Sequence, residues 1–336
     1  SRREVFHDGI QLSDYHIANI WPPPYSCRMA IMTVRGPIEA AAAGYTLSHE
    51  HLLCDLWPIV RSYDCILDDE GLAARELSAY REAGGRTLVD VTSGGLGRNP
   101  LALRRISEAA GVNVVMGAAW YREDVYPRCV YELDSAALAE VIVKELTTGT
   151  DGTDVVCGII GEIGTERNFI TPAQERVFRA SGRAQRRTGV SVITHTTHFG
   201  ELALEQIAIL REEQVPSGRI IISHLGDRPD PARLLAIARE GVYLSIDNTG
   251  YTGDGYPGDE VRAANVKLLV DQGHLTQIML SGDICMKSHL HAFGGKGYDH
   301  VPRKFLPLLR QAGVSDSEIH TMTVENPARA LNVAGN

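Results

Sequence analysis

Short apolar runs rich in β-branched residues alternate along this chain with longer stretches whose apolar residues recur at helical spacing. That alternation is typical of repeated βα units. The runs predict eight strands, at residues 45–51, 86–92, 113–120, 155–164, 190–196, 219–227, 241–248 and 277–283. The stretches at 172–189 and 230–241 each end on a glycine, as a helix followed by a turn should.

Eight consecutive βα units are most simply closed as a (β/α)8 barrel, the TIM-barrel form of the α/β class. The length of 336 residues fits either one large α/β barrel or two ordinary domains, and the eight βα units favour the barrel. We predict a barrel domain over residues 31–336 and an N-terminal extension over residues 1–30. In such a barrel the active site gathers at the carboxyl ends of the strands, so the residues at those ends decide what the protein can do.

Residue types that bind metal ions stand at the ends of five predicted strands. They are His49, His51, Glu162, His195, His224 and Asp283. In a strand, His49 and His51 share one face, whereas Glu50 between them points away, so we expect Glu50 to lie outside the site. Imidazole nitrogen and carboxylate oxygen both suit zinc, and a shared carboxylate can bridge two ions. The six residues therefore predict a site for two divalent ions.

A histidine at one strand end often only bonds a neighbouring loop, so the prediction depends on the joint pattern. A second H-x-H, His289 and His291, provides a comparison within the chain. No β-branched run leads into it and glycines follow it, which indicates a loop. We expect these two histidines at the surface or beside the ligands.

Charge and composition indicate which classes of binding partner to expect. The chain has 33 basic and 42 acidic residues, a net charge of −9, and no basic run, which argues against nucleic acid and favours a small-molecule substrate. Six cysteines without a C-x-x-C pair fit a reducing cytoplasm. No stretch approaches the roughly twenty apolar residues that cross a bilayer, so no membrane association is expected.

The six ligand types occur in a characteristic order, and the chain also contains "TVRGPI", "TLSHEH", "GGKGYDHV" and "NPARAL". In these features the chain resembles the phosphotriesterase family of the amidohydrolase superfamily, from about residue 33 to residue 332. The resemblance implies that His49, His51 and Asp283 hold the buried ion, that His195 and His224 hold the exposed ion, and that Glu162 bridges. The best-known members carry a carbamylated lysine on the fourth strand, and "GIIGEIG" has none. The glutamate is similar to the branch of phosphotriesterase homology and phosphotriesterase-related proteins, and a homodimer is expected by the same similarity.

Two ions that share a water can lower its pKa towards neutrality, which gives a hydroxide beside a polarised electrophile. Asp283 can collect the proton and return it to the leaving group as general acid. We expect two divalent metal ions, zinc first, with manganese, cobalt or iron as alternatives because histidine and carboxylate accept all of them.

The loops set the substrate. Tyr121 follows the third strand, where an aromatic residue lies near the substrate in related lactonases, and we predict that it contacts substrate. Lys287, in the loop after Asp283, could hold an anionic group, whereas Arg122 is expected to be solvated.

The leading functional hypothesis is a hydrolase of lactones or carboxylic esters. An amidase for N-acyl compounds with an acidic tail and a phosphotriester hydrolase are alternatives, and a non-enzymatic binding protein is the least favoured.

Overall fold

The computed structural model describes residues 30–197, 200–228, 230–253 and 255–333. Eight strands form one sheet in the order β12-β11-β10-β9-β8-β7-β6-β3, and each pair of neighbours is parallel. These strands are β3 (Thr46–Glu50), β6 (Thr87–Asp90), β7 (Asn113–Ala118), β8 (Ile159–Gly164), β9 (Val192–His195), β10 (Ile220–Ile222), β11 (Tyr243–Ile246) and β12 (Ile278–Leu280).

The two end strands of the sheet meet just beyond β12. There the amide of Asp283 donates to the carbonyl of His49 at 3.2 Å, and the amide of His51 donates to the carbonyl of Ile284 at 3.2 Å. The sheet is therefore a nearly closed barrel, and the predicted TIM-barrel α/β fold is confirmed. The predicted extension lies outside the described residues except for Ala30, which begins a separate hairpin of β1 (Ala30–Thr33) and β2 (Gly36–Glu39).

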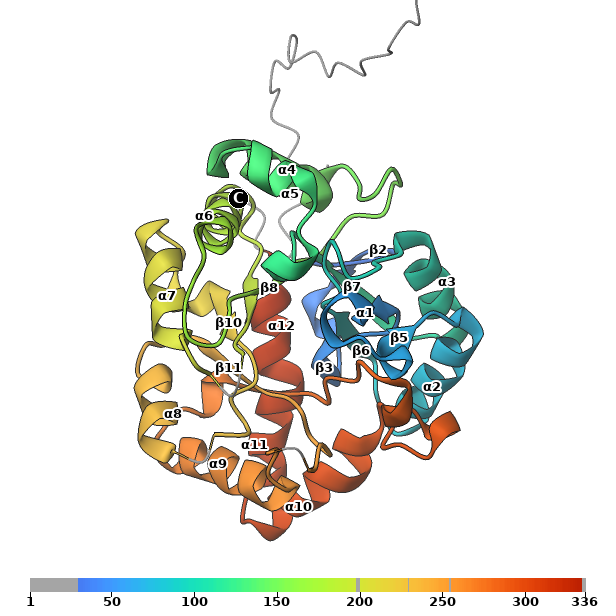
Figure 1. The fold of residues 1–336 in the computed structure, drawn as a ribbon. Coiled ribbons are helices and arrows are strands. Elements are labelled where there is room, and N and C mark those ends of the chain that lie inside the picture. Colours follow the sequence, from blue (N-terminus) through green and yellow to red (C-terminus); the bar gives the residue numbers. More distant parts are fainter. Residues whose placement is uncertain (1–29, 198–199, 229, 254, 334–336) are drawn as a thin grey trace, which may run out of the picture.

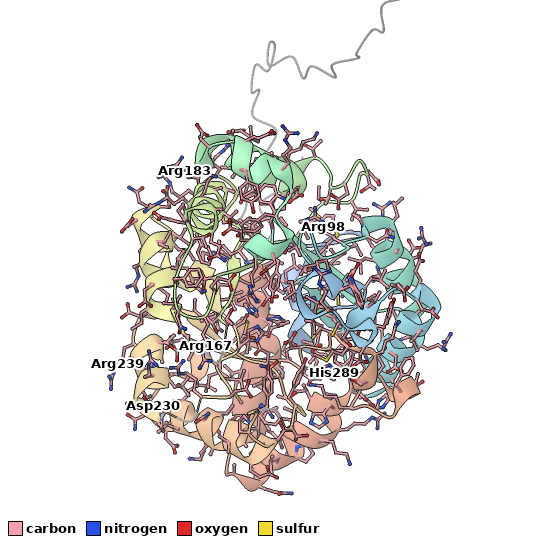
Figure 2. All side chains as sticks on the ribbon, in the orientation of Figure 1. Arg98, Arg167, Arg183, Asp230, Arg239 and His289 are labelled. Atoms are coloured by element: carbon pink, nitrogen blue, oxygen red, sulfur yellow. The ribbon has the colours of Figure 1, made fainter. Side chains whose placement is uncertain are left out.

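Helices surround the barrel, as Figure 1 shows. They are α1 (Trp57–Val60), α2 (Glu70–Glu82), α3 (Pro100–Ala110), α4 (Arg128–Glu132), α5 (Ser135–Thr147), α6 (Pro172–Thr188), α7 (Ala203–Glu212), α8 (Pro231–Ala238), α9 (Asp259–Asp271), α10 (Leu306–Gln311), α11 (Asp316–His320) and α12 (Asn326–Leu331). A second short hairpin joins β4 (Cys54–Asp55) to β5 (Ile66–Leu67). Figure 2 labels Arg183 on α6, and Asp230 and Arg239 at the two ends of α8 on the left side of the molecule.

Helix α6 illustrates how the sequence sets an element's ends. The Thr171 hydroxyl accepts a bond from the backbone N–H of Gln174, and the side-chain oxygen of Gln174 accepts one from the backbone N–H of Thr171. This capping box fixes the first turn. Pro172 follows at the first helical position, where its missing N–H costs nothing. Gly189 then ends the helix with φ 73°, a left-handed conformation that glycine adopts without strain. The predicted boundary at residues 172–189 is therefore close to the observed one.

An apolar layer fills the amino-terminal end of the barrel. It contains Val89, Val115, Ile193, Ile221 and Met279 from the strands, packed with Ile31 of β1 and Ala330 and Leu331 of α12. This packing closes one end of the barrel, so polar side chains are left to the opposite end.

All eight strands are shorter than predicted, and β8, β10 and β12 illustrate the reasons. β8 begins at Ile159 rather than at 155, because the amide of Cys157 donates to the carbonyl of Glu145 near the end of α5 instead of to a neighbouring strand. β10 and β12 end before His224 and Asp283, which have positive φ of 62° and 49°. Such strained backbone is common at functional sites. No helix among the described residues has the length and apolar character needed to cross a membrane.

Candidate metal centre

The six residues predicted as ligands come together at the carboxyl end of the barrel. Their ligand atoms form three overlapping clusters in which all atoms lie within 4.8 Å of one another. The clusters are His49–His51–Glu162, His49–His224–Asp283 and Glu162–His195–His224. Five elements far apart in sequence supply them, so the barrel topology produces the site.

The first half of the centre is built around the pair from β3. Nε2 of His49 lies 3.5 Å from Oε1 of Glu162 and 3.5 Å from Oδ1 of Asp283. Nε2 of His51 lies 3.4 Å from the same Oδ1 and 4.0 Å from Oε2 of Glu162. Two ligands about 2.1 Å from one tetrahedral ion would be about 3.4 Å apart, so these donors are spaced as ligands of a shared ion.

The second half joins the remaining histidines to the same carboxylate. Oε1 of Glu162 lies 2.8 Å from Nδ1 of His195 and 3.2 Å from Nε2 of His224. The two imidazoles approach each other to 2.8 Å. Glu162 is therefore the residue shared by both halves, as a bridging carboxylate must be.

Polar partners orient three of the four histidines from behind. Nδ1 of His49 lies 2.9 Å from the hydroxyl of Ser223, and Nδ1 of His51 lies 2.9 Å from that of Thr92. Nδ1 of His224 lies 3.0 Å from Oδ1 of Asp247. A metal-binding histidine characteristically has its other nitrogen held in this way, which leaves one nitrogen aimed at the ion.

The unpaired nitrogen of His49 provides a test of whether these residues fit metal ions. Nε2 of His49 is completely buried and has no hydrogen-bond partner among the described residues, yet two carboxylates face it. A buried polar atom without a partner is costly in a finished core. A cation between that nitrogen and the carboxylates removes the cost, so the donor set fits a pair of divalent ions.

The electrostatics of the cluster favour charged carboxylates. Burial would raise the pKa of Glu162, but His49, His195 and the bond from His224 hold this pKa well below its usual range. Burial also raises the pKa of Asp283. The hydrogen bond from His51 and the charges of His49, His224 and His51 outweigh burial and lower this pKa. Burial lowers the pKa of His195 to about 4, so this imidazole is neutral and available as a ligand.

A pocket opens onto the cluster. The described residues that line it are His195, Thr196, Thr197, His224, Asn248, Tyr256 and Asp283. Tyr121 lies beside it, with its hydroxyl 3.2 Å from Nδ1 and 3.3 Å from Nε2 of His195. The predicted substrate contact Tyr121 is thus next to the proposed ligands.

The charged residues predicted near the mouth lie differently. Lys287 has its ammonium 3.8 Å from Asp68 and lines a separate, smaller pocket. Arg122, expected to be solvated, is instead largely buried and bonds Glu166 at 2.7 Å and Asp124 at 3.2 Å. That prediction was wrong because Glu166, in the loop after β8, offers a partner that strand patterns do not reveal.

Sequence reasoning missed several polar residues that surround the site. Asn248 donates to Asp227 at 2.7 Å and lines the pocket, and its signal was its place at the end of a predicted strand. Glu50, expected to lie outside the site, is buried beside the loop that carries Asp283, and the partly buried Lys296 bonds the same loop. The two histidines of the second H-x-H have different partners. His291 bonds Asp299, whereas His289, in the loop after β12, packs against Tyr251. Figure 2 labels His289, and neither histidine joins a cluster of the described residues.

With this geometry established, comparison with known proteins decides the family. A model of the phosphotriesterase family matches residues 29–331. The chain belongs to the phosphotriesterase family. It is a metal-dependent hydrolase of that family, since the family match covers nearly the whole chain and the predicted ligands converge.

Three relatives of this phosphotriesterase-family chain are informative. The phosphotriesterase homology protein of Escherichia coli is 36% identical over 286 residues, 85% of this chain and 97% of that protein. An N-acetyltaurine hydrolase of Danio rerio is 32% identical over 344 residues, 90% of this chain and 98% of that protein. The crystal structure of a lactonase from Listeria monocytogenes has a TM-score of 0.84 at 29% identity, covering 90% of this chain and 98% of that one.

Proposed function

We propose that this chain hydrolyses lactones or carboxylic esters. The observation that carries the proposal is the neutral pocket. Beyond the proposed ligands, its described lining consists of Thr196, Thr197, Asn248 and Tyr256, which can hydrogen-bond an uncharged ester but bring no cation. The likeness to the Listeria lactonase supports the same substrate class.

The protein's own groups have separate tasks in this reaction. Divalent ions bound by the six proposed ligands would supply Lewis acidity and lower the pKa of water. The hydroxyl of Tyr121, beside His195, donates to the carbonyl oxygen of the substrate and orients it. Oδ1 of Asp283 faces His49 and His51, so its Oδ2 carries the proton from the attacking water to the leaving oxygen.

Hydrolysis of an N-acyl amide with an acidic tail is the second candidate. The relatives named N-acetyltaurine hydrolases favour it, and one of them aligns over 90% of this chain. Against it stands the charge distribution of the described residues: Arg122 is paired with Glu166 and Asp124, and Lys287 faces Asp68. An anionic tail would have to displace one of these carboxylates to gain either of these two cations.

A matched substrate screen separates the candidates. Protein reconstituted with zinc or manganese is assayed on lactones, linear esters, neutral N-acetyl amides and N-acetyltaurine. We expect kcat/KM for lactones or esters to exceed that for the amides by at least about tenfold, which is about 1.4 kcal/mol in the barrier. A reversed order would overturn the proposal. An Asp283→Asn preparation, expected to be inactive, controls for contaminating esterases.

A further inference from the structure

The loop Gly282–Ile284 after β12 carries Asp283 in a left-handed conformation, with φ 49°. A residue other than glycine holds this conformation at a cost, so its surroundings must fix it. Two of the fixing bonds come from β3 and the residue that follows it: the amide of Asp283 donates to the carbonyl of His49, and the carbonyl of Ile284 accepts from the amide of His51. The loop that carries Asp283 is therefore tied to the backbone of two other proposed ligands, through Asp283 itself and through Ile284.

Glu50, which lies between those histidines, holds the loop with its side chain. Oε1 of Glu50 accepts from the amide of Gly282 at 2.6 Å and from the hydroxyl of Ser281 at 2.7 Å. Its Oε2 accepts from the amide of Ile284 at 2.8 Å. The carboxylate thus spans the residues on both sides of Asp283, and it is completely buried.

Lys296 and Tyr251 hold the opposite side of the loop. The ammonium of Lys296 donates to the carbonyl of Gly282 at 2.6 Å and to that of Thr249 at 2.5 Å. It lies 4.0 Å from the centre of the Tyr251 ring, whose hydroxyl donates to the carbonyl of Asp283 at 2.6 Å. With these bonds, every backbone N–H and C=O from Gly282 to Ile284 has a partner.

We propose that Glu50 and Lys296 are positioning residues that fix the carboxylate of Asp283 for metal binding and proton transfer. Neither side chain belongs to the ligand clusters of the described residues. They act through the loop backbone, which they join from both sides. A displacement of about 1 Å in such a group can cost roughly a hundredfold in rate, so the rigidity of this loop has a direct functional consequence. The proposal rests on the proposed function for its effect on turnover, but its effect on metal binding does not depend on any substrate.

Glu50→Gln is the sharpest test because both carboxylate oxygens accept bonds. Whichever way the amide turns, its NH2 group meets an N–H or O–H donor of the loop. Loss of an interaction that orients a ligand typically costs 10–100-fold in metal affinity. We expect cobalt to bind the metal-free Glu50→Gln protein roughly 10–100-fold more weakly, with an altered visible spectrum. The kcat for the best ester should fall by a similar factor, with KM changed less than about twofold.

Glu76→Gln is the matched control. Glu76 is also a buried glutamate whose two oxygens accept from backbone amides of the same connection, those of His291 and Ala292. Its replacement removes the same kind of bonds eight residues beyond Asp283. We expect it to lower stability while leaving cobalt affinity and spectrum within about twofold of the parent. An equal loss of cobalt affinity in both variants would overturn the proposal.

The double variant Glu50→Gln/Lys296→Met separates positioning from general stability. The Lys296→Met change also removes the ammonium that Glu50→Gln leaves without the neighbouring Glu50 charge, so stability should recover at least in part. The loop would still lack its bonds, so cobalt affinity should stay low. Recovery of cobalt affinity together with stability, or unchanged cobalt binding by Glu50→Gln alone, would show that these residues have only a structural role. An inactive protein in the substrate screen would reject the proposed function and leave this test intact.

Discussion

Two buried glutamates of the barrel, Glu50 and Glu162, occupy similar strands and have opposite surroundings. Glu162 is enclosed by imidazoles of β3, β9 and the turn after β10, and it is shared by two ligand clusters. Glu50 is enclosed by amides, a hydroxyl and the Lys296 ammonium of the loop region. One carboxylate thus faces groups that bind ions, whereas the other faces groups that fix a backbone.

The same contrast extends to proton binding. The histidines hold the pKa of Glu162 well below its usual range in spite of burial. Burial raises the pKa of Glu50, and its bonds to Ile284, Ser281 and Gly282 only partly oppose this rise. Burial alone therefore does not identify a functional carboxylate; the chemical type of its neighbours does.

The largest effect is expected from Glu162→Gln. The amide keeps the shape but loses the charge shared by both halves of the centre, so the protein should hold fewer than two ions per chain. Loss of a residue that supports a metal ligand typically costs roughly 10–100-fold in activity. Loss of the bridging ligand itself should lower kcat by more than this. Metal content by mass spectrometry and turnover are measured on the same preparation. Full activity after this change would end the two-ion mechanism and make the two glutamates equivalent.

The loss of folding stability at acid pH should also differ between variants of the two glutamates in metal-free protein. The folded-state pKa of Glu162 is lowered from 4.5, so its contribution is present above about pH 4.5 and is lost as pH falls through the folded value. Denaturant unfolding between about pH 3 and 4.5 should show stability falling as the pH falls, with a smaller slope in Glu162→Gln. Glu50→Gln, measured alongside, should keep this acid slope. Equal slopes in the parent and Glu162→Gln would contradict the pairing of Glu162 with histidines.

The sequence was informative about Glu162 and its partners because each lies in, or soon after, a strand with a recognisable apolar pattern. Period two within β3 separated His49 and His51 from Glu50, and the barrel topology then predicted which strand ends would meet. The support from Glu50 and Lys296 was not predictable in this way, because both side chains bond irregular loop backbone. The partners of Glu50 are more than 230 positions away, and those of Lys296 are 14 and 47 positions away. The same limit explains Arg122, whose partner Glu166 lies in a loop.

A smaller effect is expected on the Glu162 side of the site from Tyr121→Phe. The hydroxyl lies beside His195, and one neutral hydrogen bond contributes about 0.5–1.5 kcal/mol, so kcat/KM should fall about 2–10-fold with metal content unchanged. Tyr131→Phe, which removes an exposed hydroxyl on α4, serves as the control and should have no effect. A kcat/KM for Tyr121→Phe equal to the parent's would remove Tyr121 from the substrate contacts.

The smallest effect is expected on the Glu50 side, from Lys287→Ala in the loop beyond Asp283. The side chain is about one-third exposed, and its ammonium is 3.8 Å from Asp68, a distance at which surface ion pairs contribute roughly 0–1 kcal/mol. We expect kcat/KM for neutral esters to stay within about twofold of the parent, as with the control Lys267→Ala on α9. N-acetyltaurine provides the decisive comparison. If its hydrolysis alone fell more than tenfold, Lys287 would have left Asp68 to hold the sulfonate, and the loop anchored by Glu50 would carry substrate recognition as well as Asp283.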